Sequence, residues 1–177
     1  MILMEWAPIG VCEQIPPFGD ALTEHILAYK GERRQASCSA WMLLYRILLD
    51  HKLGFGTVIF GVKGKPFFSD CPIFFSISHT KGICAAAVSD VPVGIDVERC
   101  RDRYNKRMIS RSLTEQEKKN FDGDFTRIWC RKEAASKISG EGLNGFPENI
   151  DSLRFLYYEN KLIVDQTAYW LTVAIDL

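Results

Sequence analysis

The stretch FTRIWCRKEAASKISGEGL, residues 125–143, decides the fold around it. Residues 125–139 favour one helix, and Gly140 is well placed to end it as a C-terminal cap. Glu133 and Lys137 lie four residues apart on this helix, and Trp129 shares their side. Such a pair is ordinarily a solvated ion pair worth about 0.2–0.5 kcal/mol. Whether Glu133 and Lys137 have a functional role beyond this ion pair depends on the other motifs of the chain.

Helices and strands extend on both sides of this stretch. Apolar residues at helical spacing predict a helix over 35–50, and another helix begins within 112–121 at one of two capping boxes, Ser112 with Glu115 or Thr114 with Glu117. A short strand is expected within residues 1–18. Further strands are predicted at 57–62, 74–79, 83–89, 91–98, 153–159, 161–166 and 169–177, with turns at Glu159-Asn160 and near Thr167.

The order of these elements predicts an α+β fold, because strands and helices mix without a regular βαβ rhythm. A helix followed by a run of strands occurs roughly twice, with a seam near residue 91. We therefore expect two halves, residues 1–90 and 91–177, in one compact unit.

Composition narrows the class of protein. The chain has 177 residues, of which 47% are hydrophobic, and its formal net charge is zero. A chain without net charge is not expected to be attracted as a whole to nucleic acid or membrane. A charged partner must therefore bind to a local patch of opposite charge. The N-terminus lacks a basic signal-peptide region and no apolar run is long enough to span a bilayer. With no zinc-like or CxxC spacing among six cysteines, we expect reduced thiols and a cytoplasmic protein.

The segment GIDVE places Asp96 and Glu98 on one face of a strand, because residues two apart point the same way. Two adjacent carboxylates repel each other, and Mg²⁺ would neutralise them while keeping water and phosphate oxygens in its shell. A solvated strand face is the ordinary explanation of a lone Asp-x-Glu. Together with Glu133, however, the two residues offer three carboxylates to one metal ion.

The segment FSISHTKG and several basic residues offer contacts for phosphate. Ser78 and His79 lie at a strand end beside Lys81, although a satisfied surface histidine is an equally good explanation. A Ser-His nucleophile pair is disfavoured, since neighbouring strand residues point to opposite faces. The remaining cations are Lys30, Arg33, Arg34, Lys65 and Lys132, the last at the rim of the site. Three carboxylates and several cations suit transfer or hydrolysis at a phosphoanhydride.

Four pieces, in this order, resemble the 4′-phosphopantetheinyl transferases of the long, surfactin-synthetase-activating type. They are GKP at 64–66, FSISHTKG at 75–82, VGIDVE at 93–98 and WCRKEAASKISGEGL at 129–143. The last follows the family pattern W-x-x-K-E-A-x-x-K-x-x-G-x-G-L at every fixed position. The final strand, YWLTVAIDL, also looks like the last strand of that family.

The resemblance implies two similar α+β halves about a pseudo-twofold axis, with coenzyme A between them. It implies an enzyme that acts as a monomer and moves the phosphopantetheine arm of coenzyme A to a serine of an apo acyl or peptidyl carrier protein, releasing adenosine 3′,5′-bisphosphate. Asp96, Glu98 and Glu133 would hold Mg²⁺, or Mn²⁺. Asp96, Glu133 and Lys137 would be catalytic, with Glu133 taking the serine proton and Lys137 stabilising the leaving phosphate.

The same resemblance assigns the coenzyme A contacts. These residues are Lys65, Pro66, Ser78, His79, Lys132 and Lys137, with Lys30, Arg33 or Arg34 at the 3′-phosphate. The chain departs from the family at Thr80, where a serine is usual, and in a short N-terminal half. Two alternatives stay open: a metal-dependent hydrolase of the coenzyme A pyrophosphate, and a non-catalytic module that binds coenzyme A or a carrier.

Overall fold

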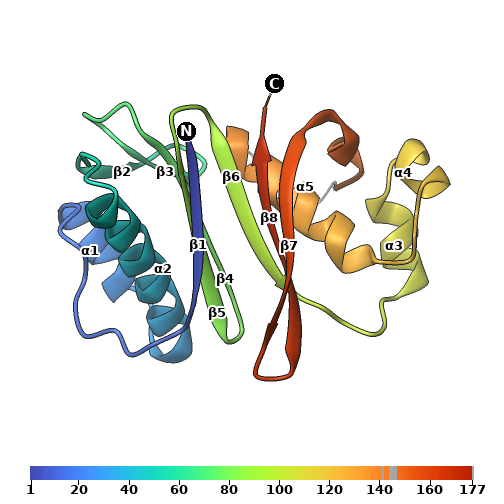
Figure 1. The fold of residues 1–177 in the computed structure, drawn as a ribbon, viewed down its shortest axis with the longest axis horizontal. Coiled ribbons are helices and arrows are strands. Elements are labelled where there is room, and N and C mark those ends of the chain that lie inside the picture. Colours follow the sequence, from blue (N-terminus) through green and yellow to red (C-terminus); the bar gives the residue numbers. More distant parts are fainter. Residues whose placement is uncertain (141, 144–146, 177) are drawn as a thin grey trace.

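The computed structural model describes residues 1–140, 142–143 and 147–176. Two antiparallel sheets lie at its centre, and helices cover both outer sides (Figure 1). The elements are β1 (Ile2–Pro8), α1 (Asp20–Leu27), α2 (Gly31–Asp50), β2 (Val58–Phe60), β3 (Pro66–Phe68), β4 (Phe74–Thr80), β5 (Ile83–Ser89), β6 (Val93–Arg99), α3 (Lys106–Ser112), α4 (Glu115–Lys119), α5 (Phe125–Ser139), the short 3-10 helices η1 (Pro147–Asn149) and η2 (Ser152–Arg154), β7 (Leu156–Val164) and β8 (Thr167–Ile175).

The two central sheets have the same strand order. One is β1-β5-β4 and the other is β6-β8-β7, so each places its last strand between the first and the second. All three strands of the first sheet precede residue 91, and all three of the second follow it. The α+β class is confirmed. The division into halves 1–90 and 91–177 stays a proposal, which this strand order supports.

Three hydrophobic clusters of described residues hold the layers together, and the smallest, Ala134, Ala135 and Ala174, lies between α5 and β8. Helix α2 buries one face against the first sheet. Its apolar residues at helical spacing Ala40, Leu43, Leu44, Ile47 and Leu48 lie in this first core, and Ala36 is also buried. The second core lies between the two sheets, where Ala85 and Ala87 of β5 meet Ile95 and Val97 of β6 and Leu171 of β8. The sheets therefore pack face to face, with β6 close to the first sheet.

Helix ends follow the sequence signals. Thr114 and Glu117 form the capping box of α4, which decides between the two boxes that the sequence allowed. Asp124 caps α5 by accepting from the N–H of Arg127, and Gly140 ends α5 in the left-handed conformation, with φ 74°. Helices α1 and α3 were not predicted.

One predicted turn is wrong. Strand β7 runs without interruption through Glu159 and Asn160, and the hairpin turn lies at Asp165 and Gln166, which both have positive φ. Glu159 stays in the strand because it pairs with Thr172 of β8 and accepts from Arg127 and Arg131 of α5. Three predicted strands at the end of the chain are thus two.

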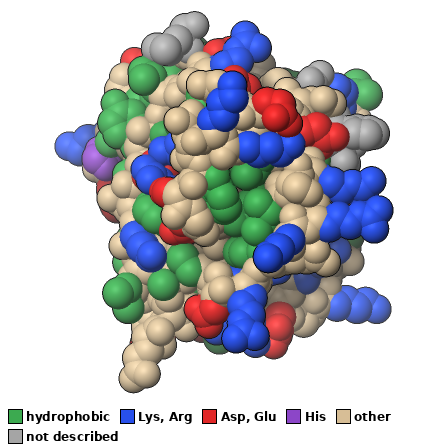
Figure 2. All heavy atoms as spheres, turned by 90° about the vertical axis from the view of Figure 1, so that its right-hand side faces the viewer, with side chains coloured by type: hydrophobic (Ala, Val, Ile, Leu, Met, Phe, Trp, Pro, Cys, Tyr) green, Lys and Arg blue, Asp and Glu red, His purple; other side chains and the backbone are tan. Residues whose placement is uncertain are grey.

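The outer face of the second half carries α3 and α4. Figure 2 shows hydrophobic side chains near the centre of this face, with Lys and Arg side chains around them. The exposed hydrophobic residues of this half include Met108 of α3, which is 39% exposed. Within the described residues, no helix is long and apolar enough to cross a membrane.

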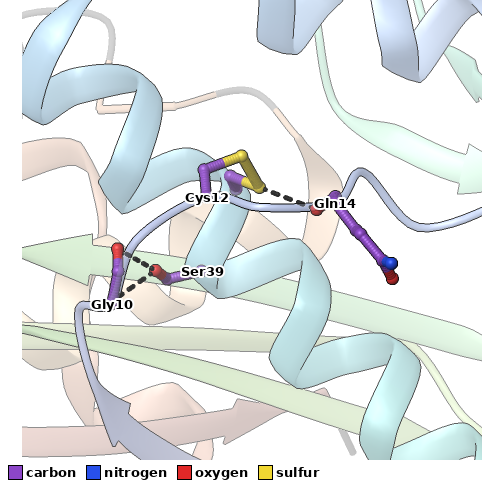
Figure 3. Close-up of a disulfide and its surroundings, with 5 residues drawn as sticks. Gly10, Cys12, Gln14 and Ser39 are labelled. Atoms are coloured by element: carbon purple, nitrogen blue, oxygen red, sulfur yellow. Dashed lines mark hydrogen bonds between the residues drawn. A yellow bond between two sulfur atoms is a disulfide. The ribbon is translucent and has the colours of Figure 1, made fainter.

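A disulfide joins Cys12 to Cys38, so the prediction that all six cysteines are reduced is wrong for this pair. Cys12 lies in the loop after β1, and Cys38 lies in α2, 26 residues further on (Figure 3). Gly10 and Ser39 also bond at this contact. The pairing was invisible in the sequence because it depends on how the loop crosses α2. The described free cysteines are Cys71, Cys84, Cys100 and Cys130.

Candidate active site

Helix α5 lies close against strand β6 because β6 has a glycine at the contact. A Cβ atom on Gly94 would lie 1.9 Å from the carbonyl oxygen of Ala134, so a larger residue cannot fit without moving the helix. Helix α5 buries Cys130, Ala134 and Ala135 at this contact or beside it. The glycine of the GIDVE segment therefore lets α5 bring its charged side chains to the carboxylates of β6.

Lys137, Asp96 and Ser78 form one cluster where the two halves meet. The Lys137 ammonium donates to Asp96 Oδ1 at 2.7 Å, to Ser78 Oγ at 2.9 Å and to the Ile95 carbonyl at 3.0 Å. Ser78 Oγ in turn donates to Asp96 Oδ1 at 2.8 Å. Asp96 is 4% exposed. Lys137 thus bonds to a buried carboxylate of the neighbouring strand, which a solvated pair with Glu133 would not explain.

The carboxylates suit a divalent cation in chemistry, but they are not gathered as a finished site. Asp96 Oδ2 is buried without a hydrogen-bond partner, and such an atom calls for an ion or a water molecule. Carboxylate oxygens are the ligands that Mg²⁺ prefers. Within the described ranges, however, no group of three His, Cys, Asp or Glu side chains is placed to hold a metal ion. The metal role of Asp96, Glu98 and Glu133 therefore stays a proposal.

Glu98 and Glu133 lie where a negative charge is unfavourable. Burial, followed by the charge of Asp96, raises the pKa of Glu98 to about 7, with Glu133 adding to the shift and Arg101 opposing it. Burial and Asp96 also raise the pKa of Glu133, against the effect of Lys137. A raised pKa suits a general base that works near neutral pH. Asp96 acts on both Glu98 and Glu133, so the three carboxylates lie near enough to influence one another's pKa.

A cavity of about 280 Å³ opens beside the cluster, between the halves. Its wall in the first half is formed by residues 63–66 and 75–77, and its wall in the second half includes Glu133 and Lys137. Glu133 also lines a second cavity, of about 800 Å³, whose other walls include Arg107, Met108, Arg111, Trp129 and Leu143. Glu133 is therefore part of the walls of two cavities.

Lys65 lines the first cavity, but its ammonium is already bonded. It donates to the Ile138 carbonyl in the last turn of α5, and burial lowers its pKa. Its side chain packs against Gly140, where a Cβ atom would lie 2.8 Å from Lys65 Cβ. Pro66 begins β3 at the same wall. The predicted contact of Lys65 with phosphate would require this cap to open.

His79 and Arg33 are two predicted phosphate contacts, and the charge of Arg33 acts on His79. Partial burial, then the positive charges of Lys137 and Arg33, lower the pKa of His79. Arg33 lies in the first turn of α2, with its guanidinium 4.2 Å from the centre of the Tyr29 ring. Lys30 is the exposed N-cap of α2, and Arg34 is half-buried in its first turn. Among the three N-terminal cations, the structure thus connects Arg33 to the site through His79.

The prediction that Lys132 contacts phosphate at the rim of the site is wrong. Its side chain is fully buried and forms an ion pair of 2.7 Å with Glu117 of α4. It also donates to the carbonyl oxygens of Pro147 and Ile150. Lys132 points away from the cluster because it lies one position before Glu133 and hence on another side of the helix. Its ammonium joins α4, α5 and the segment after α5.

Several residues at the site were not singled out in the sequence. Ser76 lines the first cavity, Arg107 and Arg111 line the second, and Gly94 allows the helix to approach. The repeated serine in FSIS was the only available signal for Ser76. For Arg107 and Arg111, the sequence signal was the segment KRMISRS, which contains basic residues and no acidic ones. In the GEGL turn, Glu141 lies outside the described residues.

Known proteins resemble this chain over a region that contains Asp96 and Lys137 of the cluster. Residues 92–162 match the sequence model described as the 4′-phosphopantetheinyl transferase superfamily. The chain is 35% identical over 145 residues to 4′-phosphopantetheinyl transferase AcpT of Escherichia coli K12, covering 75% of this chain and 65% of that protein. It is 34% identical over 125 residues to the AcpT protein of Salmonella typhimurium, covering 64% of this chain and 62% of that protein.

A relative from another genus matches over a shorter stretch. The chain is 31% identical over 90 residues to 4′-phosphopantetheinyl transferase psf-1 of Bacillus pumilus, covering 46% of this chain and 39% of that protein. The chain thus spans less than two thirds of the length of these curated relatives. The matched residues 92–162 contain Asp96, Glu98, Glu133 and Lys137. The chain belongs to the 4′-phosphopantetheinyl transferase superfamily.

Proposed function

We propose that the protein transfers the 4′-phosphopantetheine arm of coenzyme A to a serine of an apo acyl or peptidyl carrier protein. The observation that carries the proposal is the position of Glu133. Glu133 lines both the cavity between the halves and the cavity beside α3, and the charge of Asp96 acts on it. One cavity would take coenzyme A and the other would admit the carrier serine.

The transfer makes one bond and breaks one. The serine oxygen bonds to the phosphorus that carries pantetheine, and the bond from this phosphorus to the bridging oxygen breaks. Adenosine 3′,5′-bisphosphate leaves with the electron pair. Glu133 takes the serine proton, directly or through water, and its raised pKa favours this. Lys137 donates to the leaving phosphate as its charge grows.

Asp96, Glu98 and Glu133 would hold Mg²⁺, with Mn²⁺ as the alternative. The ion would neutralise charge on the pyrophosphate when bound. The support is the donor type of the three residues, the unpartnered Oδ2 of Asp96 and the pKa of Glu98, which is raised to about 7. Lys137 pairs with Asp96 Oδ1 at 2.7 Å and so balances part of this negative charge.

The phosphates of coenzyme A would lie against the first half. His79 and Arg33 would supply donors there, since the charge of Arg33 acts on His79, and Lys65 and Pro66 line the first cavity. Arginine suits phosphate because its planar fork donates two parallel hydrogen bonds. Lys30 and Arg34 remain further candidates for the 3′-phosphate.

The carrier would dock on the second half. Helix α3 has the sequence KRMISRS, which contains three cations and no acid. The face that carries it shows Lys and Arg around hydrophobic side chains (Figure 2). Such a face fits a partner with acidic residues around an apolar contact. Docking there would place the carrier serine at the cavity that Glu133 shares.

Both walls of the first cavity come from one chain, which supports a monomer as the active unit. A cytoplasmic location is also proposed, where coenzyme A and carrier proteins would meet the enzyme. The Cys12–Cys38 disulfide is the observation against it, since disulfides are rare in that compartment.

Intact-protein mass spectrometry tests the proposed function. The protein is mixed with coenzyme A, Mg²⁺ and a panel of apo carrier proteins. We expect one carrier to gain the mass of one phosphopantetheine arm, and the gain to disappear when the metal is chelated. Hydrolysis of coenzyme A without a carrier would support the hydrolase alternative. Tight binding of coenzyme A with no transfer to any carrier would support the binding module.

Glu133→Gln provides the matched variant for this assay. It keeps the size of the side chain and removes its charge and basicity, so we expect turnover to fall by about 100-fold or more. Glu5→Gln is the control, because Glu5 is a surface acid of β1 that pairs with Arg46 of α2 in the first half. Near-normal turnover of Glu133→Gln would contradict the assigned role.

A further inference from the structure

Strands β4 and β6 are joined by hydrogen bonds from the backbone of β6 to serine side chains of β4. The two strands belong to different sheets, and the described ladders do not pair them. Ser76 Oγ accepts from the Ile95 N–H at 3.0 Å, and Ser78 Oγ accepts from the Val97 N–H at 3.4 Å. The two bonds keep the same spacing of two residues on each strand. They therefore fix β4 in one register along β6.

These bonds cover an edge that would otherwise be open. Ile95 and Val97 direct their N–H groups away from β8, the hydrogen-bonded neighbour of β6, and toward β4. The Ile95 carbonyl lies on the same edge and accepts from Lys137. Buried backbone polar groups need partners, and an unpaired edge also invites other strands. Side chains from β4 and α5 supply the partners here.

Ser78 uses its whole hydrogen-bonding capacity in this arrangement. A hydroxyl has one donor and two acceptor positions. Ser78 Oγ donates to Asp96 Oδ1 and accepts from both Lys137 and Val97. Ser76 and Ser78 are only 6% and 7% exposed. Binding of a phosphate by this hydroxyl would require one of these bonds to break, so the contact that the sequence suggested is not the one that the geometry favours.

We propose that Ser76 and Ser78 are positioning residues that hold the two halves of the site in register. Ser78 fixes the Asp96–Lys137 pair, and Ser76 fixes the same strand two residues earlier. Because His79 follows Ser78 on β4, the two serines also set the distance between the phosphate contacts of the first half and the carboxylates of the second. The catalytic part of this inference rests on the proposed function, whereas the register does not.

Amide hydrogen exchange measured by NMR tests the register without any assay of activity. In the unaltered protein we expect slow exchange at Ile95 and Val97. Ser76→Ala should speed exchange at Ile95, and Ser78→Ala should speed it at Val97. Ser89→Ala is the control: Ser89 is fully buried in β5, accepts from the Val91 N–H and donates to the Met1 carbonyl, away from the cluster. If the exchange rates of Ile95 and Val97 are unchanged in Ser76→Ala and Ser78→Ala, the proposal is overturned.

Kinetics and binding then separate positioning from phosphate binding. If Ser78 positions Asp96 and Lys137, Ser78→Ala should lower kcat by about 10- to 100-fold, as for loss of a hydrogen bond to charged groups. Binding of adenosine 3′,5′-bisphosphate, measured by calorimetry without metal, should change less than about threefold. A larger loss of binding with kcat retained would make Ser78 a phosphate ligand and overturn the proposal. Faster exchange with unchanged kcat in both variants would leave only a structural role and also overturn it.

The experiments test the proposed function and the strand register independently. If the unaltered protein shows no transfer to any carrier, the proposed function fails, yet the exchange rates of Ile95 and Val97 still decide the register. If transfer occurs but the exchange rates do not respond, the proposed function stands and the serine bonds are not what holds the halves.

Discussion

At the scale of single residues, burial and partner decide the role of a charged side chain. Lys132 and Lys137 lie on the same helix and both fit the family pattern. Lys132 is fully buried and paired with Glu117, whereas Lys137 is partly exposed and paired with Asp96 at the cavity. One lysine therefore joins parts of the fold, and the other lies at the proposed active site.

Lys132→Met should destabilise the protein because it leaves Glu117 buried without a counter-ion. Loss of one partner of a buried ion pair costs about 3–5 kcal/mol of unfolding free energy. Urea unfolding measures this loss. The double variant Lys132→Met with Glu117→Leu replaces both charges with apolar groups and should recover much of the stability. A loss below about 1 kcal/mol in the single variant would contradict the buried pair.

The same pair predicts a dependence of stability on pH. Burial alone raises the pKa of Glu117, but hydrogen bonds from Lys132 and Ser152 outweigh it and lower the pKa below its ordinary value. The stability from this carboxylate is therefore fully present above the unfolded pKa of about 4.3 and is lost as pH falls through the folded pKa. Denaturation midpoints between pH 3 and 6 should fall less steeply with acidification in the double variant. Equal slopes would contradict the assignment.

At the scale of secondary-structure elements, the site depends on how α5 meets β6 and the first half. Gly94 allows the helix backbone to approach β6, and Lys65 caps the far end of the helix from the other half. Helix α5 is thus held at both places by residues from outside it. Two glycines of the motifs thus have a structural reason. Gly140 ends α5 in the left-handed conformation, and Gly94 leaves room for α5 against β6.

Gly94→Ala should separate α5 from β6. The added methyl would overlap the Ala134 carbonyl, so the helix must shift, at a cost of about 1–3 kcal/mol or more in unfolding free energy. The shift would also lengthen the Lys137–Asp96 contact and lower kcat. Gly54→Ala is the control, because a Cβ atom there meets nothing within 4 Å. Chemical denaturation and transfer kinetics check both variants, and equal behaviour of the two would contradict the close approach.

At the scale of the whole molecule, the proposed site draws residues from both of the proposed halves. Asp96, Glu98, Glu133 and Lys137 belong to the second half, while Ser78, His79 and Arg33 belong to the first. The core between the sheets holds these groups together. The proposed substrate, with a nucleotide at one end and a transferred arm at the other, suits a site that spans two halves.

The disulfide should stabilise the first half. It closes a loop between residues 26 apart, for which chain entropy predicts about 3–4 kcal/mol. Thermal melting with and without a reductant should show a lower Tm after reduction. Cys12→Ser with Cys38→Ser should lower Tm similarly and make it insensitive to the reductant. A Tm that reductant leaves unchanged in the unaltered protein would mean that the bond does not form.

Much of the fold followed from local patterns. The spacing of Ala40, Leu43 and Leu44 predicted α2, and the Gly140 cap predicted the end of α5. The turn at Glu159-Asn160 failed because those residues favour turns locally, whereas the pairing of Glu159 with Thr172 and its bonds to two arginines keep the strand straight. Tertiary contacts override weak local preferences in this way.

The sequence by itself determined which residue types the site contains. Alternation in GIDVE put Asp96 and Glu98 on one face, and helical spacing put Glu133 and Lys137 on one side, because both periods are fixed by backbone geometry. Only the tertiary structure decided which groups meet. It paired Lys137 with Asp96, buried Lys132 against Glu117 and joined Cys12 to Cys38. These contacts depend on packing between segments far apart in the chain, and no local period encodes that packing.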